Sequence, residues 1–211
     1  MNITTFTRFH FMNAYFVRED DGLTLVDTTM NAAGQLLAAA ERLGAPIRRI
    51  ALTHGHGDHV GSLDALKQRL GDSVDVLMPE IDARIHAGER EKTNGSWPKI
   101  ATIPDVRLHE GDRVGILEVV ASPGHTPGHV SFLDTRDRAL IAGDVFTSYG
   151  RVETTSRLYW RFPLATTATW DKEKNLASAQ KLRTLEPATL FVGHGPPVHE
   201  PLPAIDRALR R

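Results

Sequence analysis

The sequence predicts an α/β protein in which two layers of strand and helix fold over each other, with sheets inside and helices outside. Apolar β-branched runs alternate with helix-periodic segments in the first half of the chain, and the same alternation returns in the second half. The chain has 211 residues, of which 41% are hydrophobic, so it can bury one core. It contains no short repeat or low-complexity tract, and we expect a single domain over residues 1–211.

The first half of the chain begins with strands. Residues 11–20 and 22–29 are short apolar runs joined by an Asp-Asp-Gly turn, which predicts an antiparallel hairpin. Helical spacing follows over 31–44 with Gly44 as C-cap, and an extended apolar run over 47–54 ends on His54. A helix with Ser62 as N-cap is predicted over 62–71, then a strand over 74–80 and a helix over 81–89.

The second half repeats this pattern after a polar stretch over residues 90–105. Strands are predicted within 113–125, 129–146 and 189–194, because each segment is rich in apolar and β-branched residues. A single long helical segment is predicted over 166–187.

Composition excludes several classes of function. Twenty-five Lys and Arg against twenty-six Asp and Glu give a net charge of −1, so we expect no nucleic-acid partner. Cysteine is absent, which excludes disulfides, thiolate metal ligands and a cysteine nucleophile. The first residues show no basic and apolar leader, and no apolar run approaches the roughly 20 residues that span a membrane. We therefore expect a cytoplasmic protein without a membrane partner.

The segment LTHGHGDHVGS, residues 52–62, concentrates imidazole and carboxylate groups. Three histidines and one aspartate lie within six residues and are separated by Gly55 and Gly57. A buried imidazole needs hydrogen-bond partners or a ligand for both nitrogens, so this density indicates a binding site. The glycines let the loop curl until His54 and His56 point at one centre while Asp58 and His59 point at a second. The spacing is typical of a metal site at a sheet edge.

Three further residues occupy equivalent places in the chain. His125 lies in SPGHTPGH, Asp144 in LIAGDVF and His194 in LFVGHG, each where an apolar strand runs into glycine or proline. In this order, THGHGDHVGS, PGHTPGH, AGDVF and GHG resemble the motif set of the metallo-β-lactamase fold superfamily of metal-dependent hydrolases. The resemblance runs from about residue 23 to about residue 196 and implies a four-layer αβ/βα sandwich.

The resemblance also implies a ligand set for two divalent metal ions, zinc first, with manganese or iron as alternatives. One metal would be bound by His54, His56 and His125 and the second by Asp58, His59 and His194, with Asp144 bridging them. Two such ions share a water whose pKa falls to about neutrality, which supplies hydroxide to attack a small ester, thioester or lactone. Asp58 is the expected catalytic residue, because it is placed to pass a proton to the leaving group.

Other functions remain as alternatives. The main one is a mononuclear iron oxygenase resembling the persulfide dioxygenases, which keep HxHxDH but use only part of it; metal content separates the two. A β-lactamase is disfavoured by the absent signal peptide and by the position of Asp144. Glyoxalase II-like enzymes add a C-terminal helical region for glutathione, whereas only residues 195–211 follow His194. Lactonases carry a tyrosine shortly after the bridging aspartate, where this chain has Thr147, with Tyr149 two residues on.

Residues outside the motifs receive weaker predictions. His129 is expected to hold its loop by hydrogen bonds, and Asp27 to support a ligand or a turn. Solvent exposure or helix capping is the default for the isolated histidines His10, His86, His109 and His199. Loops 89–103 and 147–169 are expected to line the mouth, with Tyr149, Arg151 and Tyr159 nearer to the site than His86 or His109. The further residues of these loops expected there are Trp97, Lys99, Trp160 and Arg161. Substrate identity and oligomeric state stay open.

Overall fold

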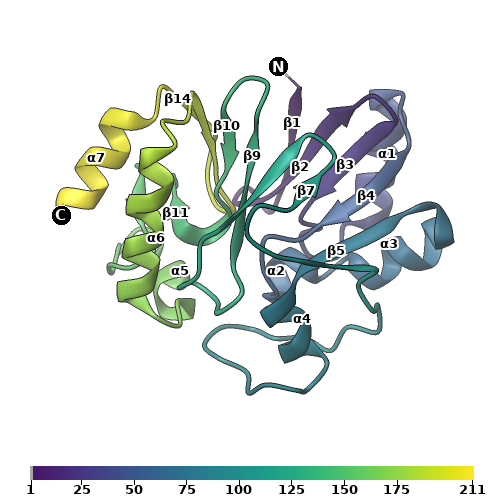
Figure 1. The fold of residues 1–211 in the computed structure, drawn as a ribbon, viewed down its shortest axis with the longest axis horizontal. Helices are drawn as coiled ribbons and strands as arrows, with labels where there is room; N and C mark the ends of the chain where they lie inside the picture. Colours follow the sequence, from purple (N-terminus) through teal and green to yellow (C-terminus); the bar gives the residue numbers. More distant parts are fainter. Residues whose placement is uncertain (1) are drawn as a thin grey trace.

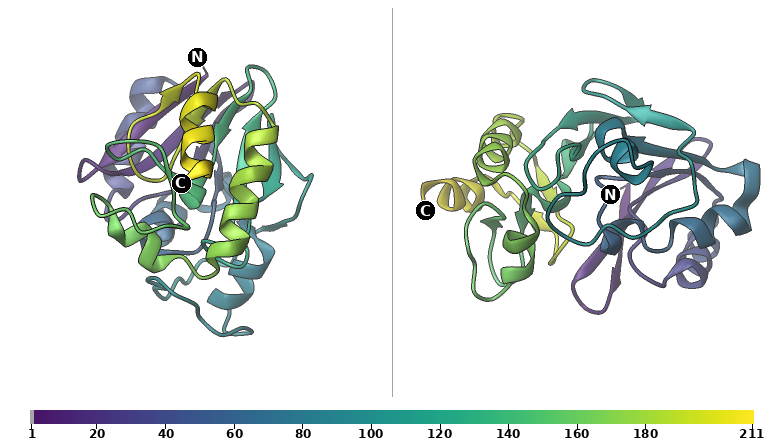
Figure 2. Two further views of the ribbon diagram at one scale, coloured as in Figure 1. Left: turned by 90° about the vertical axis from the view of Figure 1, so that its left-hand side faces the viewer. Right: turned by 90° about the horizontal axis from the view of Figure 1, so that it is seen from below.

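Two six-stranded sheets pack face to face, and helices cover both outer faces (Figures 1 and 2). The structure is a computed structural model that describes residues 2–211. Figure 1 shows α1 and α3 outside the first sheet and α6 and α7 outside the second. The four layers confirm the predicted αβ/βα sandwich.

The first sheet has its strands in sequence order. The antiparallel part confirms the predicted hairpin: β1 (Ile3–Arg8), β2 (Met12–Glu19) and β3 (Gly22–Val26). Parallel pairing then adds β4 (Ile47–Ala51), β5 (Asp75–Pro79) and β6 (Val106–Leu108). The intervening helices are α1 (Ala33–Leu43), α2 (Gly57–Val60), α3 (Leu63–Leu70) and α4 (Glu80–His86), with the 3-10 turn η1 (Gly71–Ser73).

The second sheet has the order β14-β13-β10-β9-β8-β7. Its strands are β7 (Arg113–Val114), β8 (Leu117–Ala121), β9 (Val130–Asp134), β10 (Ala139–Ile141), β13 (Thr189–Phe191) and β14 (Val198–His199). A small pair, β11 (Phe146–Thr147) and β12 (Glu153–Thr154), follows the 3-10 turn η2 (Gly143–Val145). The outer helices are α5 (Pro163–Ala168), α6 (Lys172–Thr184) and α7 (Leu202–Arg210).

The core lies between the two sheets and continues under the helices. Tyr15 and Val26 of the first sheet belong to one buried cluster with Phe132, Ile141 and Phe191 of the second. Separate apolar clusters fill the outer faces, one under α1 and α3 and one under α6 and α7. Each sheet is therefore buried on both sides, which leaves the polar strand ends as the place for a site.

Local signals set several helix ends as predicted. Gly44 ends α1 in the left-handed conformation (φ 69°), where its N–H reaches the carbonyls of Ala40 and Glu41. Ser62 does precede α3, but it makes no capping hydrogen bond to that helix. Its hydroxyl instead accepts from the Ala32 N–H at 2.8 Å and donates to the Thr29 carbonyl at 3.2 Å. Ser62 thus ties α3 to the loop before α1.

The predicted single helix over 166–187 is wrong. The chain forms two helices, α5 and α6, separated at residues 169–171. Thr169 leaves the helical conformation, and the Asp171 side chain accepts from the Lys174 N–H to start α6. The motif described as a loop also contains a short helix, α2, that carries Asp58 and His59.

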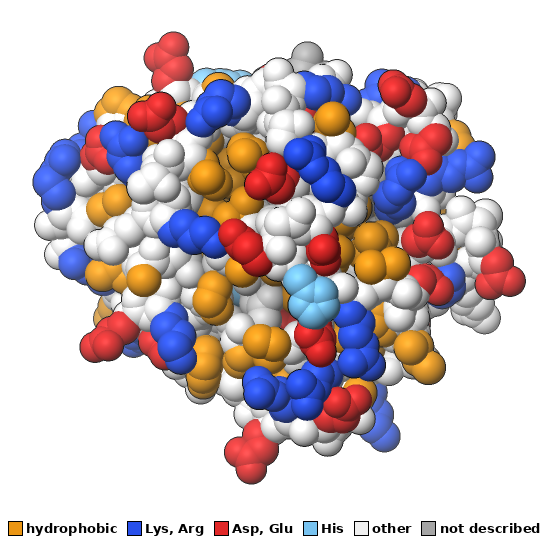
Figure 3. Space-filling model, in the orientation of Figure 1, with side chains coloured by type: hydrophobic (Ala, Val, Ile, Leu, Met, Phe, Trp, Pro, Cys, Tyr) orange, Lys and Arg blue, Asp and Glu red, His pale blue; other side chains and the backbone are white. Residues whose placement is uncertain are grey.

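The surface carries interspersed charges. Figure 3 shows Lys and Arg side chains mixed with Asp and Glu over the face drawn, without a large patch of one sign. Among residues 2–211, none of the helices has the length and apolar character that crossing a membrane requires.

Candidate metal centre

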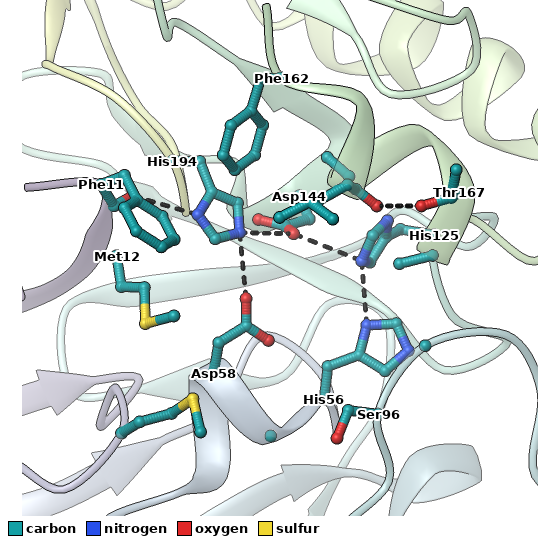
Figure 4. Close-up of a pocket in the computed structure, with 16 residues that line it drawn as sticks. Phe11, Met12, His56, Asp58, Ser96, His125, Asp144, Phe162, Thr167 and His194 are labelled. Carbon is teal, nitrogen blue, oxygen red and sulfur yellow. Dashed lines mark hydrogen bonds and ion pairs between the residues drawn. The ribbon is translucent and has the colours of Figure 1, made fainter. Parts of the chain in front are cut away.

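All seven predicted ligand residues meet at the strand ends of the two sheets, and Figure 4 shows five of them: His56, Asp58, His125, Asp144 and His194. They form two groups, and within each group one ligand atom per residue lies within 4.8 Å of the others. The first group is His54, His56 and His125; the second is Asp58, His59, Asp144 and His194. His54 and His56 follow β4, His125 follows β8, Asp144 follows β10 and His194 follows β13. The strand ends of both sheets therefore bring together residues that are distant in sequence.

Two histidines of the first group, His56 and His125, point unprotonated ring nitrogens at each other. His56 Nδ1 lies 3.0 Å from His125 Nε2. His56 Nε2 lies 2.9 Å from the Asn94 carbonyl and His125 Nδ1 lies 3.0 Å from the Thr169 hydroxyl, which itself donates to the Ala165 carbonyl. We assign the ring protons to these outer nitrogens, so the facing nitrogens can only accept. Two acceptors this close repel each other unless a proton or a metal ion lies between or beside them.

Asp27 orients one ligand residue in each group. Its carboxylate accepts from His59 Nδ1 at 2.8 Å and from the Thr53 hydroxyl at 2.9 Å. Thr53 in turn lies 3.0 Å from His54 Nδ1. The Nε2 atoms of His54 and His59 are buried without a hydrogen-bond partner and face the centre. The interpretation of Asp27 as a partner of a ligand is confirmed, since it sets the ring tautomer of both histidines.

Asp144 lies between the two groups. Its Oδ2 is 3.1 Å from His194 Nε2 and 3.3 Å from His125 Nε2, while its Oδ1 is 3.5 Å from His59 Nε2. His194 Nδ1 lies 3.1 Å from the Phe11 carbonyl, which leaves Nε2 free to approach Asp144 and, at 3.2 Å, Asp58 Oδ2. Asp144 is thus the one carboxylate within reach of both groups in the described chain, as the resemblance implies.

The electrostatics separate the two groups. Burial lowers the pKa of His54, His56 and His125, so these rings are neutral and can offer lone pairs. Burial also disfavours the protonated, charged form of His59 and His194, but the attraction of neighbouring carboxylates for that form is stronger than the cost of burial.

Asp27 and Asp144 raise the pKa of His59 well above its usual value. Asp144 and Asp58 raise the pKa of His194 to about 10. In return, His59 and His194 hold the pKa of both Asp58 and Asp144 well below the usual range despite burial. Both carboxylates are therefore ionised at neutral pH.

The donor set fits divalent transition metals. Five imidazole nitrogens and two carboxylates converge, and three of their atoms are buried without a partner: His54 Nε2, His59 Nε2 and Asp144 Oδ1. Cations that accept nitrogen and oxygen ligands satisfy such a set, whereas a purely hydrogen-bonded cluster would leave these atoms unpaired.

His129 supports the centre as a hydrogen-bonding residue. Its Nε2 accepts from the Asp144 backbone N–H at 3.0 Å, and its Nδ1 lies 3.0 Å from the Ser122 hydroxyl. Burial lowers the pKa of His129 to about 3, so the ring stays neutral and keeps Nε2 as an acceptor. The prediction that His129 acts by hydrogen bonding is confirmed, and its main partner is the backbone of Asp144.

Two residues of α4 act on the ligand loops, and the sequence did not reveal them. Asp82 is fully buried and accepts from the Gly55 N–H at 2.9 Å, the Thr126 hydroxyl at 2.7 Å and the Gly128 N–H at 2.8 Å. It therefore joins the loop of His54 and His56 to the loop of His125. His86 Nε2 lies 2.8 Å from the Gly55 carbonyl, and the ring is half-buried. The default of solvent exposure is wrong for His86.

A cavity of about 420 Å³ opens above the centre. Both predicted loops line it. Loop 89–103 contributes Gly95 and Ser96, and loop 147–169 contributes Phe162 and residues of α5. Tyr149, Arg151 and Tyr159 do not line it, and neither do His86 and His109, so their predicted order of distance from the site stays a prediction. The other four residues expected at the mouth, Trp97, Lys99, Trp160 and Arg161, do not line it either.

The remaining histidines match their predictions. His10, His109 and His199 are exposed.

Trp97 is buried behind the centre, with its ring 5.1 Å from that of His56, and its Nε1 donates to the Asn94 carbonyl at 3.1 Å. It therefore supports the position of His56.

Comparisons with known proteins agree with this geometry. Residues 7–194 match the family model described as "Metallo-beta-lactamase superfamily". Uncharacterized protein YobT of Bacillus subtilis is 37% identical over 99% of this chain and 94% of its own length. Hydroxyacylglutathione hydrolase of Rhodopseudomonas palustris is 39% identical, over 56% of this chain and 41% of that enzyme. Among solved structures, TTHA1623 in a di-iron-bound form is 28% identical with a TM-score of 0.72, covering 97% of both chains.

Proposed function

Because the chain belongs to the metallo-beta-lactamase superfamily, we propose that it is a dinuclear metal-dependent hydrolase that cleaves a small ester, thioester or lactone. The observation that carries the proposal is the pair of ligand groups with Asp144 between them. His54, His56 and His125 would hold one metal, Asp58, His59 and His194 the second, and Asp144 would contact both. Zinc is the proposed metal, with manganese or iron as alternatives, and the di-iron form of TTHA1623 supports a site for two metals.

When bound, two divalent ions supply a hydroxide at neutral pH and polarise the carbonyl of the substrate. The chain's own residues supply position and proton transfer. Asp58 lines the cavity, its side chain is 27% exposed, and it is ionised. It can therefore orient the attacking group by accepting a hydrogen bond and then carry a proton to the leaving oxygen or sulfur.

The second ligand group favours the hydrolase over the persulfide dioxygenase alternative. A mononuclear oxygenase needs only part of the motif, whereas here His59 and His194 are each oriented by a hydrogen bond at Nδ1. Those contacts hold both Nε2 atoms toward Asp58 and Asp144. A fully oriented second group is the arrangement that a second metal requires.

Metal analysis of the purified protein, paired with activity on esters, thioesters and lactones, tests this proposal. We expect close to two transition-metal ions per chain and hydrolysis that a chelator abolishes. The double variant His54→Ala/His56→Ala should lose mainly one of the two ions, and His59→Ala should lose mainly the other. One iron per chain with oxygen uptake on a persulfide, or full hydrolytic activity without metal, would overturn the proposal.

A further inference from the structure

The cavity above the metal centre has an apolar wall. Besides the polar floor, it is lined by side chains from three separate segments of the chain. Phe11 and Met12 come from the β1–β2 hairpin and Met30 from the segment after β3. Phe162, Leu164, Ala165 and Ala168 come from α5 and the residue before it. A substrate that reaches the centre therefore has hydrocarbon on one side.

The apolar wall stands beside one ligand group. In Figure 4, Phe11 and Phe162 flank His194, and Met12 lies toward Asp58. The Phe162 ring centroid is 4.8 Å from that of His194 and 5.9 Å from that of Phe11. Tyr149 packs on Phe162 at 5.4 Å, which fixes the ring although Tyr149 does not line the cavity. These contacts hold the wall in place against a bound chain.

Lysine and arginine are missing from the described lining of the cavity. None of the described residues that line the cavity is Lys or Arg, whereas Asp58 and Asp144 both line it. Two cations of the loops beside the cavity have other partners: Arg151 binds Glu153 at 2.9 Å, and Lys92 donates to the Trp97 carbonyl at 3.0 Å. Arg161 stacks over the exposed Trp160 ring at 5.2 Å. A charged group at the end of a substrate chain that lies against the apolar wall, away from the centre, would meet hydrocarbon and neither lysine nor arginine.

We propose that the substrate carries an apolar chain, without charge along its length, that lies against Phe11, Met12, Met30, Phe162 and Leu164. This inference rests on the proposed hydrolase function and adds the substrate class to it. It separates the chain from enzymes whose thioester substrates carry carboxylates, because this wall offers hydrocarbon and no cation. Leu164 is 64% exposed at the edge of the cavity, so the wall continues outward and can cover a chain longer than the cavity floor alone.

Ester series with the purified holoenzyme test the proposal. One series varies the acyl chain from acetyl through butanoyl and hexanoyl to octanoyl with a constant leaving group, and the other varies the alcohol with a constant acetyl group. In one of the two series, kcat/KM should rise about fourfold for each added methylene until the wall is covered. The series that responds identifies which side of the ester the wall contacts. The adipoyl ester, which ends in a carboxylate where hexanoyl ends in a methyl group, should react at least roughly tenfold more slowly than the hexanoyl ester.

Matched variants locate the effect. Leu164→Arg should flatten the chain-length dependence, because it places a charge on the wall. Leu158→Arg is the control, since Leu158 is 73% exposed in the same segment but does not line the cavity. It should keep the wild-type dependence. Loss of the dependence in both variants, or in neither, would overturn the placement of the chain on this wall.

A binding measurement separates this inference from the proposed function. Unreactive methyl ketones of increasing chain length should bind the holoenzyme with affinities that rise about fourfold per methylene, and Leu164→Arg should remove that rise. If no ester, thioester or lactone is cleaved but the ketones behave in this way, the hydrolase proposal fails and the apolar wall stands. If esters are cleaved at rates independent of chain length, or the adipoyl ester as fast as the hexanoyl ester, the apolar-substrate inference fails and the hydrolase stands.

Discussion

Replacing Asp82 tests whether one buried carboxylate holds the two ligand loops in register. Asp82 Oδ2 accepts from the Gly55 N–H and the Thr126 hydroxyl, and Oδ1 accepts from the Gly128 N–H. Asparagine has nearly the same shape but only one acceptor oxygen. Asp82→Asn can therefore keep the two bonds at one oxygen, while its amide group faces the Gly128 N–H donor to donor.

The expected magnitude follows from this count of hydrogen bonds. One buried donor left unpaired costs about 1–3 kcal/mol, so Asp82→Asn should lower the free energy of unfolding by about that amount. Asp82→Ala leaves all three donors unpaired and should cost several times more. Since the loops of His54, His56 and His125 both lose an anchor, metal affinity should fall by about tenfold to a hundredfold, the usual effect of removing support from ligands.

Urea unfolding and metal titration with a competing chelator measure the two effects. Asp64 provides a matched control, because its carboxylate also accepts three hydrogen bonds, from the N–H and hydroxyl of Thr102 and from the Ala101 N–H. Asp64 anchors residues 101 and 102, at the end of the loop that precedes β6, and makes no hydrogen bond to the loops of His54, His56 and His125. Asp64→Asn should lower stability without changing metal affinity. Unchanged metal affinity in Asp82→Asn, or an equal loss in both variants, would refute the reasoning.

The pH dependence of stability adds a second test of the same residue. Burial raises the pKa of Asp82 to about 6 from its ordinary 3.8, so the folded state holds this proton more tightly than the unfolded state. Its contribution to stability is therefore fully present below about pH 4 and is lost as pH rises through about 6. The stability advantage of the wild type over Asp82→Asn should shrink by up to about 3 kcal/mol across this range, since each pKa unit is worth about 1.4 kcal/mol.

Two further predictions concern the centre itself. Asp58→Asn should keep the fold yet lose about a hundredfold or more in turnover, with a larger loss for an alkoxide leaving group than for an activated aryl ester, because good leaving groups need less protonation. Equal losses on both substrates would limit Asp58 to metal binding. Chelation should lower the melting temperature, because the ligands tie four loops together. Metal added back near neutral pH should release protons, since the pKa of His59 is raised and that of His194 is about 10. Fewer protons should be released as pH approaches 10, and calorimetry in buffers of different ionisation enthalpy counts them. An unchanged melting temperature, or no proton release at neutral pH, would contradict this coupling.

The fold was predictable where local signals and tertiary packing agree. The hairpin of β2 and β3, the end of α1 at Gly44 and the strand leading to His54 follow from turn residues and periodicity that burial then satisfies. The break between α5 and α6 was missed because residues 166–171 contain no glycine or proline. Tertiary contacts make this break: the N–H groups of Trp170 and Asp171 donate to the carbonyls of His125 and Gly124, and the Thr169 hydroxyl accepts from His125 Nδ1.

The ligands were predictable and their supports were not, for one physical reason. Each predicted ligand lies in a short motif at a strand end, and the order of these motifs along the chain resembles that of a known superfamily, so the residues that meet at the centre could be named from the sequence. Asp82 and His86 act only because parallel pairing of β4 with β5 places α4 beside the loop at Gly55. Likewise, the aromatic and charged residues expected at the mouth contact one another, as Arg151 does with Glu153 and, at 4.8 Å, with the Tyr159 ring.

The choice of ring nitrogen shows how far the centre depends on the fold. His56 presents Nδ1 because its Nε2 is bound to the Asn94 carbonyl, whereas His194 presents Nε2 because its Nδ1 is bound to the Phe11 carbonyl. Both partners are backbone atoms of segments remote from the motifs, so substitution of their side chains leaves these acceptors in place. The Phe11 carbonyl belongs to the hairpin whose side chains form part of the apolar wall. One short segment thus fixes both the orientation of a ligand and the surface offered to the substrate, so metal affinity and chain-length preference should change together when that hairpin is displaced.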